Sequence, residues 1–220
     1  QSQIEQTIFM NDYQAFFQDY EGCIVILDAS HNQLTVYNNE LTQQEASPCS
    51  TFKIISGLIG LEEGVLSSGD STMSYTGLKY PIDAWNMELT FKEAFQCSCV
   101  WYFKQVLEQV GNNKVEQYIH QLNYGNEDIS TWDGSGMNPT EDTNGFWLES
   151  SLKITPVQQV NLLSNIFDKY AIFSKHNIEI MKDILYVDSN QSYSLYGKTG
   201  TGNHQAWYVG FFEQDQERYY

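Results

Sequence analysis

The sequence is short of basic residues and has no long apolar run, and each shortage excludes a class of protein. Eleven lysines and arginines stand against 28 acidic residues, which gives a formal net charge of −17 at pH 7. Nucleic-acid-binding proteins need a basic face against phosphate, so we expect no nucleic-acid partner. No apolar run approaches the roughly 20 residues that a membrane-spanning helix requires. The N-terminus also lacks a basic region followed by an apolar stretch, so we expect no signal peptide.

Cysteine and histidine are also scarce, and their spacing predicts no metal site. The four cysteines match no zinc pattern, and the four histidines show no paired spacing. Cys97 and Cys99 flank a serine, and Cys49 directly precedes another. A disulfide from Cys49 to either of them needs Cα atoms within about 7 Å, so a bridge and buried free thiols both stay open. Cys23 lies in an apolar segment and is expected in the core.

The length and the order of elements predict one α+β domain. A chain of 220 residues with 41% hydrophobic content can bury one substantial core, and no repeat or low-complexity linker divides it. Strand patterns occur at both ends and helical patterns between them. This order predicts one antiparallel sheet, formed by N- and C-terminal strands, packed against helices with a helical lobe beside it. We expect strands near 22–28, 34–38, 193–199 and 206–213, and helices near 50–63, 90–110, 113–122, 155–168 and 174–185.

A hydroxyl and an amine stand one helical turn apart in Ser50-Thr51-Phe52-Lys53. Residues i and i+3 of a helix are surface neighbours, so we expect the Lys53 amine beside the Ser50 hydroxyl. A serine becomes a good nucleophile when a base removes its proton, and a lysine whose pKa is lowered by burial can be that base. On their own, two residues with this spacing are more often a helix N-cap and a surface or salt-bridged amine than a catalytic pair.

Two further motifs accompany this tetrapeptide. Lys198-Thr199-Gly200 ends one strand pattern and a second apolar run, 206–212, follows a short turn, which together predict a hairpin. Ser98-Cys99-Val100 falls between two apolar helical stretches and offers a second hydroxyl at a helix start. We expect the active site in a cleft between lobe and sheet, where the Ser50 helix begins beside the Lys198 strand.

In this order the motifs resemble the serine β-lactamase and penicillin-binding protein superfamily, and within it the class D β-lactamases. The resemblance covers roughly residues 20–214. It implies a single β-lactamase-type domain over residues 1–220 that hydrolyses β-lactam antibiotics outside the cytoplasm, as a monomer or weak homodimer. Further stretches that carry it are Gly22-Cys23-Ile24-Val25-Ile26-Leu27-Asp28, Tyr124-Gly125-Asn126 and Phe146-Trp147-Leu148-Glu149-Ser150-Ser151-Leu152.

The resemblance implies roles for the residues around the nucleophile. Ser50 opens the β-lactam ring and forms an acyl-enzyme, with its own backbone N–H and that of Thr201 as oxyanion donors. Lys53, desolvated beside Val100 and Trp147, reacts with carbon dioxide to give a carbamate that serves as general base in acylation and deacylation. The indole N–H of Trp147 hydrogen-bonds that carbamate. We expect no other cofactor, and a plain core aromatic is the alternative for Trp147.

The remaining site residues are assigned to proton transfer and substrate binding. Ser98 relays a proton between Lys198 and the leaving lactam nitrogen. Lys198 and Thr199 attract the substrate carboxylate, and Gly200 permits close backbone approach of the ligand.

One departure from the family concerns the C-terminus. The family has a closing strand and helix, with a basic residue on that helix that binds the substrate carboxylate. This sequence ends at Tyr220 before the equivalent position, and Arg218, its only arginine, is badly placed for the task. We expect either that the sequence is truncated or that another cation, Lys198 alone, anchors the carboxylate.

Three other functions stay open. The first is the extracellular penicillin-sensing domain of a membrane receptor, which would be stably acylated at Ser50. Sensors have asparagine where this chain has Val100, and an apolar valine favours the carbamate. The second is a D-alanyl-D-alanine peptidase, against which the Trp147 stretch argues. The third is an inactive binding module, which the intact set of motifs makes least favoured.

Overall fold

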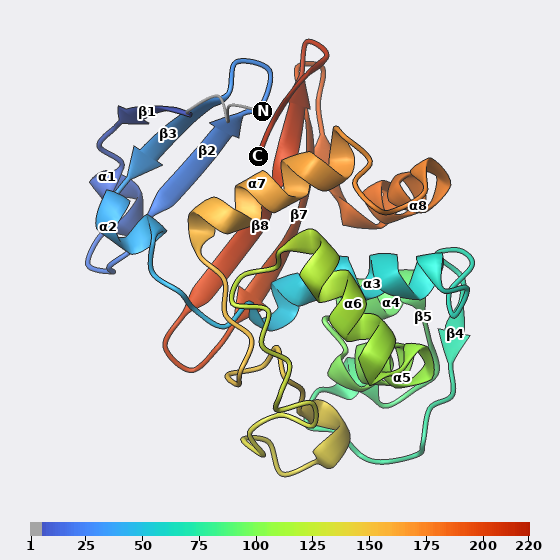
Figure 1. Cartoon of the computed structure of the whole chain (residues 1–220). Coiled ribbons are helices and arrows are strands. Elements are labelled where there is room, and N and C mark those ends of the chain that lie inside the picture. The colour runs from blue at the N-terminus through green and yellow to red at the C-terminus, as the bar shows by residue number, and fades with distance from the viewer. Residues whose placement is uncertain (1–5) are drawn as a thin grey trace.

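The computed structural model describes residues 6–220, and a seven-stranded sheet joins the two ends of the chain (Figure 1). The strand order is β1-β3-β2-β9-β8-β7-β6, so the N-terminal strands lie beside the C-terminal ones. The junction is short, because β2 meets β9 through Asp28 and Tyr219. The strands are β1 (Thr7–Met10), β2 (Ile24–Asp28), β3 (Gln33–Tyr37), β6 (Tyr186–Ser189), β7 (Ser194–Thr201), β8 (Ala206–Gln214) and β9 (Glu217–Tyr219).

The predicted α+β class, with terminal strands in one sheet, is confirmed, but the sheet is mixed rather than antiparallel. β1 runs parallel to β3, whereas every other neighbouring pair is antiparallel. The chain reaches this geometry by crossing from β1 through α1 (Gln14–Phe17) before it enters the β2–β3 hairpin. The side chains of β1 are all exposed, so no buried face imposes an alternating pattern that sequence reasoning could detect.

Two of the helices that pack around the sheet begin at residues that are strong helix-start signals. In α7 (Pro156–Phe167), Thr155 and Gln158 form a reciprocal capping box, and proline occupies the first turn. In α8 (Lys175–Leu185), the Ser174 side chain accepts a hydrogen bond from the Asn177 backbone N–H. Figure 1 shows α7 lying across the sheet, with α8 beyond its far end.

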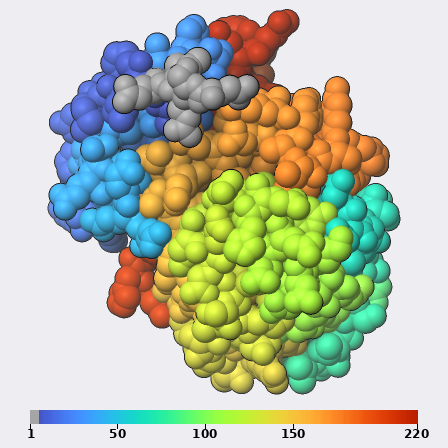
Figure 2. Space-filling view, viewed as in Figure 1, coloured from blue at the N-terminus to red at the C-terminus, as the bar shows by residue number. Residues whose placement is uncertain are grey.

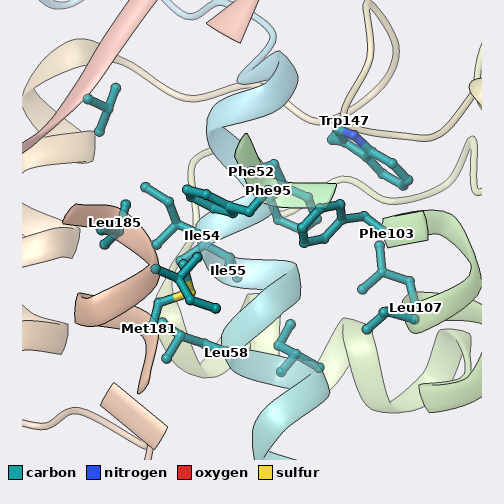
Figure 3. Close-up of a cluster of buried hydrophobic side chains, with 14 of the residues drawn as sticks. Phe52, Ile54, Ile55, Leu58, Phe95, Phe103, Leu107, Trp147, Met181 and Leu185 are labelled. Carbon is teal, nitrogen blue, oxygen red and sulfur yellow. The ribbon is translucent and has the colours of Figure 1, made fainter. Parts of the chain in front are cut away.

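The central helix α3 (Lys53–Glu62) begins directly after the 3-10 turn η1 (Cys49–Phe52) and is buried along nearly its whole length. Its apolar side chains extend in two directions, toward α8 and toward α5 (Val100–Val110) (Figure 3). On the first side lie Met181 and Leu185, and on the second Phe103 and Leu107. This packing holds Lys53, the first residue of α3, between the helical lobe and the part of the core beside the sheet.

The helical pattern expected over 90–110 is two helices, α4 (Phe91–Gln96) and α5, with a tight turn between them. The Cys99 N–H donates to the Ala94 carbonyl over 2.8 Å and the Ser98 N–H to the Phe95 carbonyl over 3.2 Å. Ser98 has a left-handed backbone, φ +54°. This is the Schellman pattern that ends helices, normally with glycine at the left-handed position.

The rest of the lobe consists of α6 and short elements. Figure 2 shows the lobe as the green and yellow part of the surface, with the N-terminal strands on the opposite side. No helix within residues 6–220 is long and apolar enough to cross a membrane. The remaining elements are α2 (Asn39–Thr42), β4 (Thr72–Met73), η2 (Asp83–Trp85), β5 (Leu89–Thr90), α6 (Asn112–Leu122) and η3 (Glu141–Thr143).

Candidate active site

The turn that presents Ser50 has an unusual backbone. Cys49, directly before the serine, has φ +49°, in the left-handed region that side chains other than glycine rarely adopt. The Cys49 N–H donates to the Trp147 carbonyl over 3.0 Å, which holds this conformation in place. Such strain costs of order 1–3 kcal/mol and is found where surrounding structure imposes it, often at active sites. Ser50 itself is half-buried at the beginning of the helix.

The amine of Lys53 lies against the Ser50 hydroxyl, as the spacing predicts. Its Nζ donates a hydrogen bond to Ser50 Oγ over 2.9 Å, and the side chain is completely buried. Burial, and then the nearby charge of Lys198, lower the pKa of Lys53 to about 7. No carboxylate within residues 6–220 forms an ion pair with it, so the salt-bridged interpretation is not the one observed.

A second hydroxyl and amine pair joins the lobe to the sheet. Lys198 on β7 donates from Nζ to the Ser98 hydroxyl, and also to the Thr199 carbonyl over 2.9 Å. The Phe95 ring lies 5.6 Å from the same nitrogen. Burial lowers the pKa of Lys198 to about 8. The structure therefore brings the two predicted Ser–Lys pairs together, close enough for the charge of Lys198 to lower the pKa of Lys53.

The strand after Lys198 presents alternate residues to the solvent. Thr199 and Thr201 are exposed, whereas Gly200 is buried. A Cβ on Gly200 would lie 3.0 Å from Thr51 Cγ2, 3.1 Å from the Pro48 carbonyl oxygen and 3.2 Å from the Thr51 nitrogen. The absence of a side chain at Gly200 therefore lets β7 pack against the turn that carries Ser50, and the close approach of a ligand to this glycine stays a prediction.

Trp147 has a buried donor without an acceptor. Its side chain is 2% exposed, and its Nε1 is among the few buried polar atoms of residues 6–220 that have no hydrogen-bond partner. The ring stacks on Phe52 with centroids 5.8 Å apart. Val100, also assigned to this pocket, is 7% exposed at the start of α5. A buried unpaired N–H costs about 1–3 kcal/mol, so Trp147 holds an unused hydrogen-bond donor inside the site.

Sequence reasoning missed the residues that fasten the site together. The Ser47 hydroxyl donates to the Trp147 carbonyl and accepts from the Glu149 N–H, both over 2.9 Å. The Ser47 carbonyl accepts from the side chains of Gln205 and Trp207, over 2.6 and 3.0 Å. These bonds join three segments: the turn that carries Ser50, the loop that carries Trp147 and Glu149, and the hairpin of β7 and β8. They span 100 residues or more, so no local pattern predicts them.

The structure answers whether Cys49 forms a disulfide. All four cysteines are free thiols, which leaves no bridge from Cys49. Cys23, expected in the core, is half-buried one residue before β2.

Arg218 forms ion pairs with Asp168 over 2.7 Å and with Glu213 over 2.6 Å, on the wall of a separate hollow of about 610 Å³. The poor placement expected for this arginine is therefore observed.

The chain belongs to the penicillin binding protein transpeptidase domain family, whose match covers residues 18–220. Within residues 6–220 no three histidine, cysteine or acidic side chains are arranged to hold a metal ion. The relatives include class D β-lactamases and the BlaR1 regulatory proteins, so the resemblance identified from the motifs is confirmed.

Two relatives of this chain, one a probable β-lactamase and one a regulatory protein, are similar to it to the same extent. The chain is 32% identical to the probable β-lactamase YbxI of Bacillus subtilis (strain 168) over 206 residues, which are 92% of this chain and 73% of that protein. It is also 32% identical to the regulatory protein BlaR1 of Bacillus licheniformis over 209 residues, 92% of this chain. The match spans only 33% of that regulatory protein.

Solved structures show the same two groups. The C-terminal domain of the Bacillus licheniformis BlaR penicillin-receptor matches with a TM-score of 0.87 and 30% identity, over 97% of this chain and 85% of that one. A class D β-lactamase from Bacillus subtilis matches with a TM-score of 0.85 and 31% identity, over 95% and 85% of the two chains. Overall similarity therefore does not separate enzyme from sensor.

Proposed function

We propose that this chain hydrolyses β-lactam antibiotics through an acyl-enzyme at Ser50. The observation that carries the proposal is the 2.9 Å hydrogen bond between Ser50 Oγ and the fully buried Lys53, whose pKa is lowered to about 7. A lysine is a competent base near neutral pH only when it is neutral there. The proposal places the chain with the class D β-lactamases among its relatives.

Acylation follows from the groups that touch one another. The neutral Lys53 amine accepts the Ser50 proton while Oγ attacks the lactam carbonyl carbon. The backbone N–H groups of Ser50 and Thr201 stabilise the oxyanion. The carbonyl-to-nitrogen bond then breaks, and the lactam nitrogen takes a proton from the Ser98 hydroxyl, which Lys198 replenishes.

Substrate orientation is assigned to β7. Lys198 supplies positive charge near the substrate carboxylate, and the exposed hydroxyl of Thr199 donates to it. Arg218 is excluded from this role by its own ion pairs with Asp168 and Glu213. These assignments predict a site for an anionic β-lactam, outside the cytoplasm where such antibiotics are met.

Carboxylation of Lys53 fits the residues present. A neutral amine is the form that adds carbon dioxide, and the unpaired Nε1 of Trp147 supplies a buried donor to an added carboxylate. Val100 and Phe103 keep the pocket apolar, with the Phe103 ring 5.6 Å from the lysine nitrogen. When present, that carboxylate supplies an anionic general base for both acylation and deacylation, in place of the neutral amine. Trp147 and Lys53 are the residues that would hold it.

The experiment is steady-state hydrolysis of nitrocefin, a chromogenic cephalosporin, with and without bicarbonate. We expect many turnovers per protein molecule, faster with bicarbonate and abolished by Ser50→Ala. Lys53→Met should also abolish turnover, and Lys114→Met is its control for loss of a lysine, because Lys114 is exposed and its amine pairs with Glu63. A single stoichiometric burst without turnover would contradict the proposal.

The second candidate is a penicillin-sensing domain, which the similarity to the BlaR penicillin-receptor favours. The two functions share acylation and differ in the lifetime of the acyl-serine. Val100 favours hydrolysis, because an asparagine at this position could compete for the lysine. A lasting penicillin adduct on Ser50 would support the sensor.

A further inference from the structure

Three thiols surround the two active-site lysines, and the mechanism uses none of them. Cys49 and Cys99 are fully buried, whereas Cys97 is half-buried. The electrostatic influence of all three sulfurs reaches Lys53, and that of Cys97 reaches Lys198. Cys97 is therefore the one thiol of the three that a reagent can approach, and it lies beside the catalytic groups.

Cys97 and Cys99 are in contact across the turn that carries Ser98. The Cys97 thiol donates to the Ala94 carbonyl over 3.8 Å, the same oxygen that accepts from the Cys99 N–H over 2.8 Å, and the Cys99 thiol lies close enough to stabilise a thiolate at Cys97. The contact arises because Ser98 is left-handed, which folds the chain back between the end of α4 and the start of α5. Residues two apart in such a turn fall within the range of Cα separation that a disulfide requires.

The surroundings activate one sulfur and not the other. The nearby Cys99 thiol, with a smaller contribution from the charge of Lys53, lowers the pKa of Cys97. Burial and the same contact raise the pKa of Cys99. A thiolate is the nucleophile in disulfide exchange, so an accessible low-pKa cysteine next to a second cysteine has the features of a reactive and a resolving thiol.

We propose that Cys97 and Cys99 are a redox-active pair that small-molecule disulfides oxidise to a disulfide bridging Ser98. The Cys97 thiolate attacks one sulfur of a disulfide R–S–S–R, which forms a mixed disulfide and releases one thiolate RS⁻. The Cys99 sulfur then attacks the Cys97 sulfur and displaces the second RS⁻, which leaves with the Cys99 proton as RSH. The protein loses two thiol hydrogens and the small disulfide is reduced to two thiols.

The bridge closes around the residue that contacts Lys198. A Cys97–Cys99 disulfide constrains the backbone of Ser98, whose hydroxyl accepts from the Lys198 amine. The hydroxyl then loses its alignment for proton transfer to the leaving nitrogen. We expect acylation by penicillin to slow by about a hundredfold, the lower end of what general acid–base catalysis contributes.

The test treats the full chain with hydroxyethyl disulfide and follows its intact mass. We expect a transient adduct of one mercaptoethanol unit, then a mass lower than the reduced chain by two hydrogens, mapped to the peptide containing 97–99 and reversed by dithiothreitol. Cys99→Ser should stop at the mixed disulfide, and Cys97→Ser should form neither product. Cys23→Ser is the matched control, because Cys23 is also half-buried but burial raises its pKa and the wild-type result should persist.

Several results would overturn the proposal. The wild-type chain could keep the mixed disulfide without resolving it, react first at Cys23, or lose two hydrogens as readily in Cys97→Ser. Peptide mapping of the unmutated chain decides the site even if a variant fails to fold. The thiol chemistry involves no β-lactam, so its failure is distinct from failure of the hydrolase function. An unchanged penicillin acylation rate in the oxidised chain would contradict the effect assigned to Ser98.

Discussion

The Lys53 amine donates a 2.9 Å hydrogen bond to the Ser50 hydroxyl from a completely buried position. A buried ammonium without a carboxylate is strongly disfavoured, so the protein holds this lysine near the point of losing its proton. The consequence is a base placed on the nucleophile. It is also an amine in the form that carbon dioxide can modify.

The pH dependence of nitrocefin kcat/KM should report both lysines. The pKa of Lys53 is lowered to about 7, so its amine gains a proton and stops acting as a base as the pH falls through 7. The pKa of Lys198 is lowered to about 8, so its attraction for the substrate carboxylate is lost as the pH rises through 8. We expect a bell-shaped profile with its maximum between these values. A profile that rises steadily to pH 10 would contradict the assignment.

Trp147→Phe should remove the benefit of bicarbonate. The substitution keeps an aromatic ring against Phe52 but deletes the unpaired indole N–H that we assign to the carboxylated lysine. We expect kcat to fall by about a hundredfold, near the lower end of a general base's contribution, and to become independent of bicarbonate. Trp132→Phe is the matched control, since Trp132 is a partly buried tryptophan that stacks on Phe146 rather than on Phe52. An undiminished response to bicarbonate in Trp147→Phe would contradict the role.

Substitutions of Ser98 should change the stability of the protein and its acylation rate in different ways. Its φ of +54° suits glycine, so Ser98→Gly should raise the free energy of unfolding by up to about 1 kcal/mol relative to Ser98→Ala. Both variants lack the hydroxyl that contacts Lys198 and should acylate slowly. Urea unfolding and penicillin acylation rates measure the two effects. If Ser98→Gly kept the wild-type acylation rate, the proton relay would be wrong.

Gly200→Ala should damage the site through its backbone. The added Cβ would press on the turn at Pro48 and Thr51 and move β7 away from Ser50. We expect acylation to slow by about tenfold to a hundredfold, since small misplacements of reacting groups have effects of this size. Gly69→Ala is the control, because its nearest contact would be 3.9 Å and its φ is not positive. Equal acylation rates in the two variants would argue against close packing as the role of Gly200.

The elements with strong local signals could be predicted from the sequence. A helix start is indicated for α7 by Thr155, Pro156 and Gln158, and for α8 by Ser174. The Ser50 and Lys53 contact follows from helical spacing, because both residues lie in consecutive turns of one continuous segment. Short-range physics therefore determines each half of the site.

The features that sequence reasoning missed depend on contacts between distant segments. Nothing near Gly200 indicates that it faces Thr51, and the bonds of Ser47 join three segments that only the fold brings together. The sequence places Ser98 between two helical stretches, but its left-handed backbone was missed, because a serine gives no signal for such a turn. The edge strand β1 is exposed and lacks an alternating pattern.

The measurement that tests the central claim most directly is intact mass of the chain over time after a small excess of benzylpenicillin in bicarbonate buffer. The account predicts an adduct on Ser50 that forms and then disappears, with hydrolysed penicillin in solution and no adduct on Ser50→Ala. An adduct that remains stoichiometric long after the free penicillin has been removed would contradict hydrolysis and identify a penicillin-sensing domain instead.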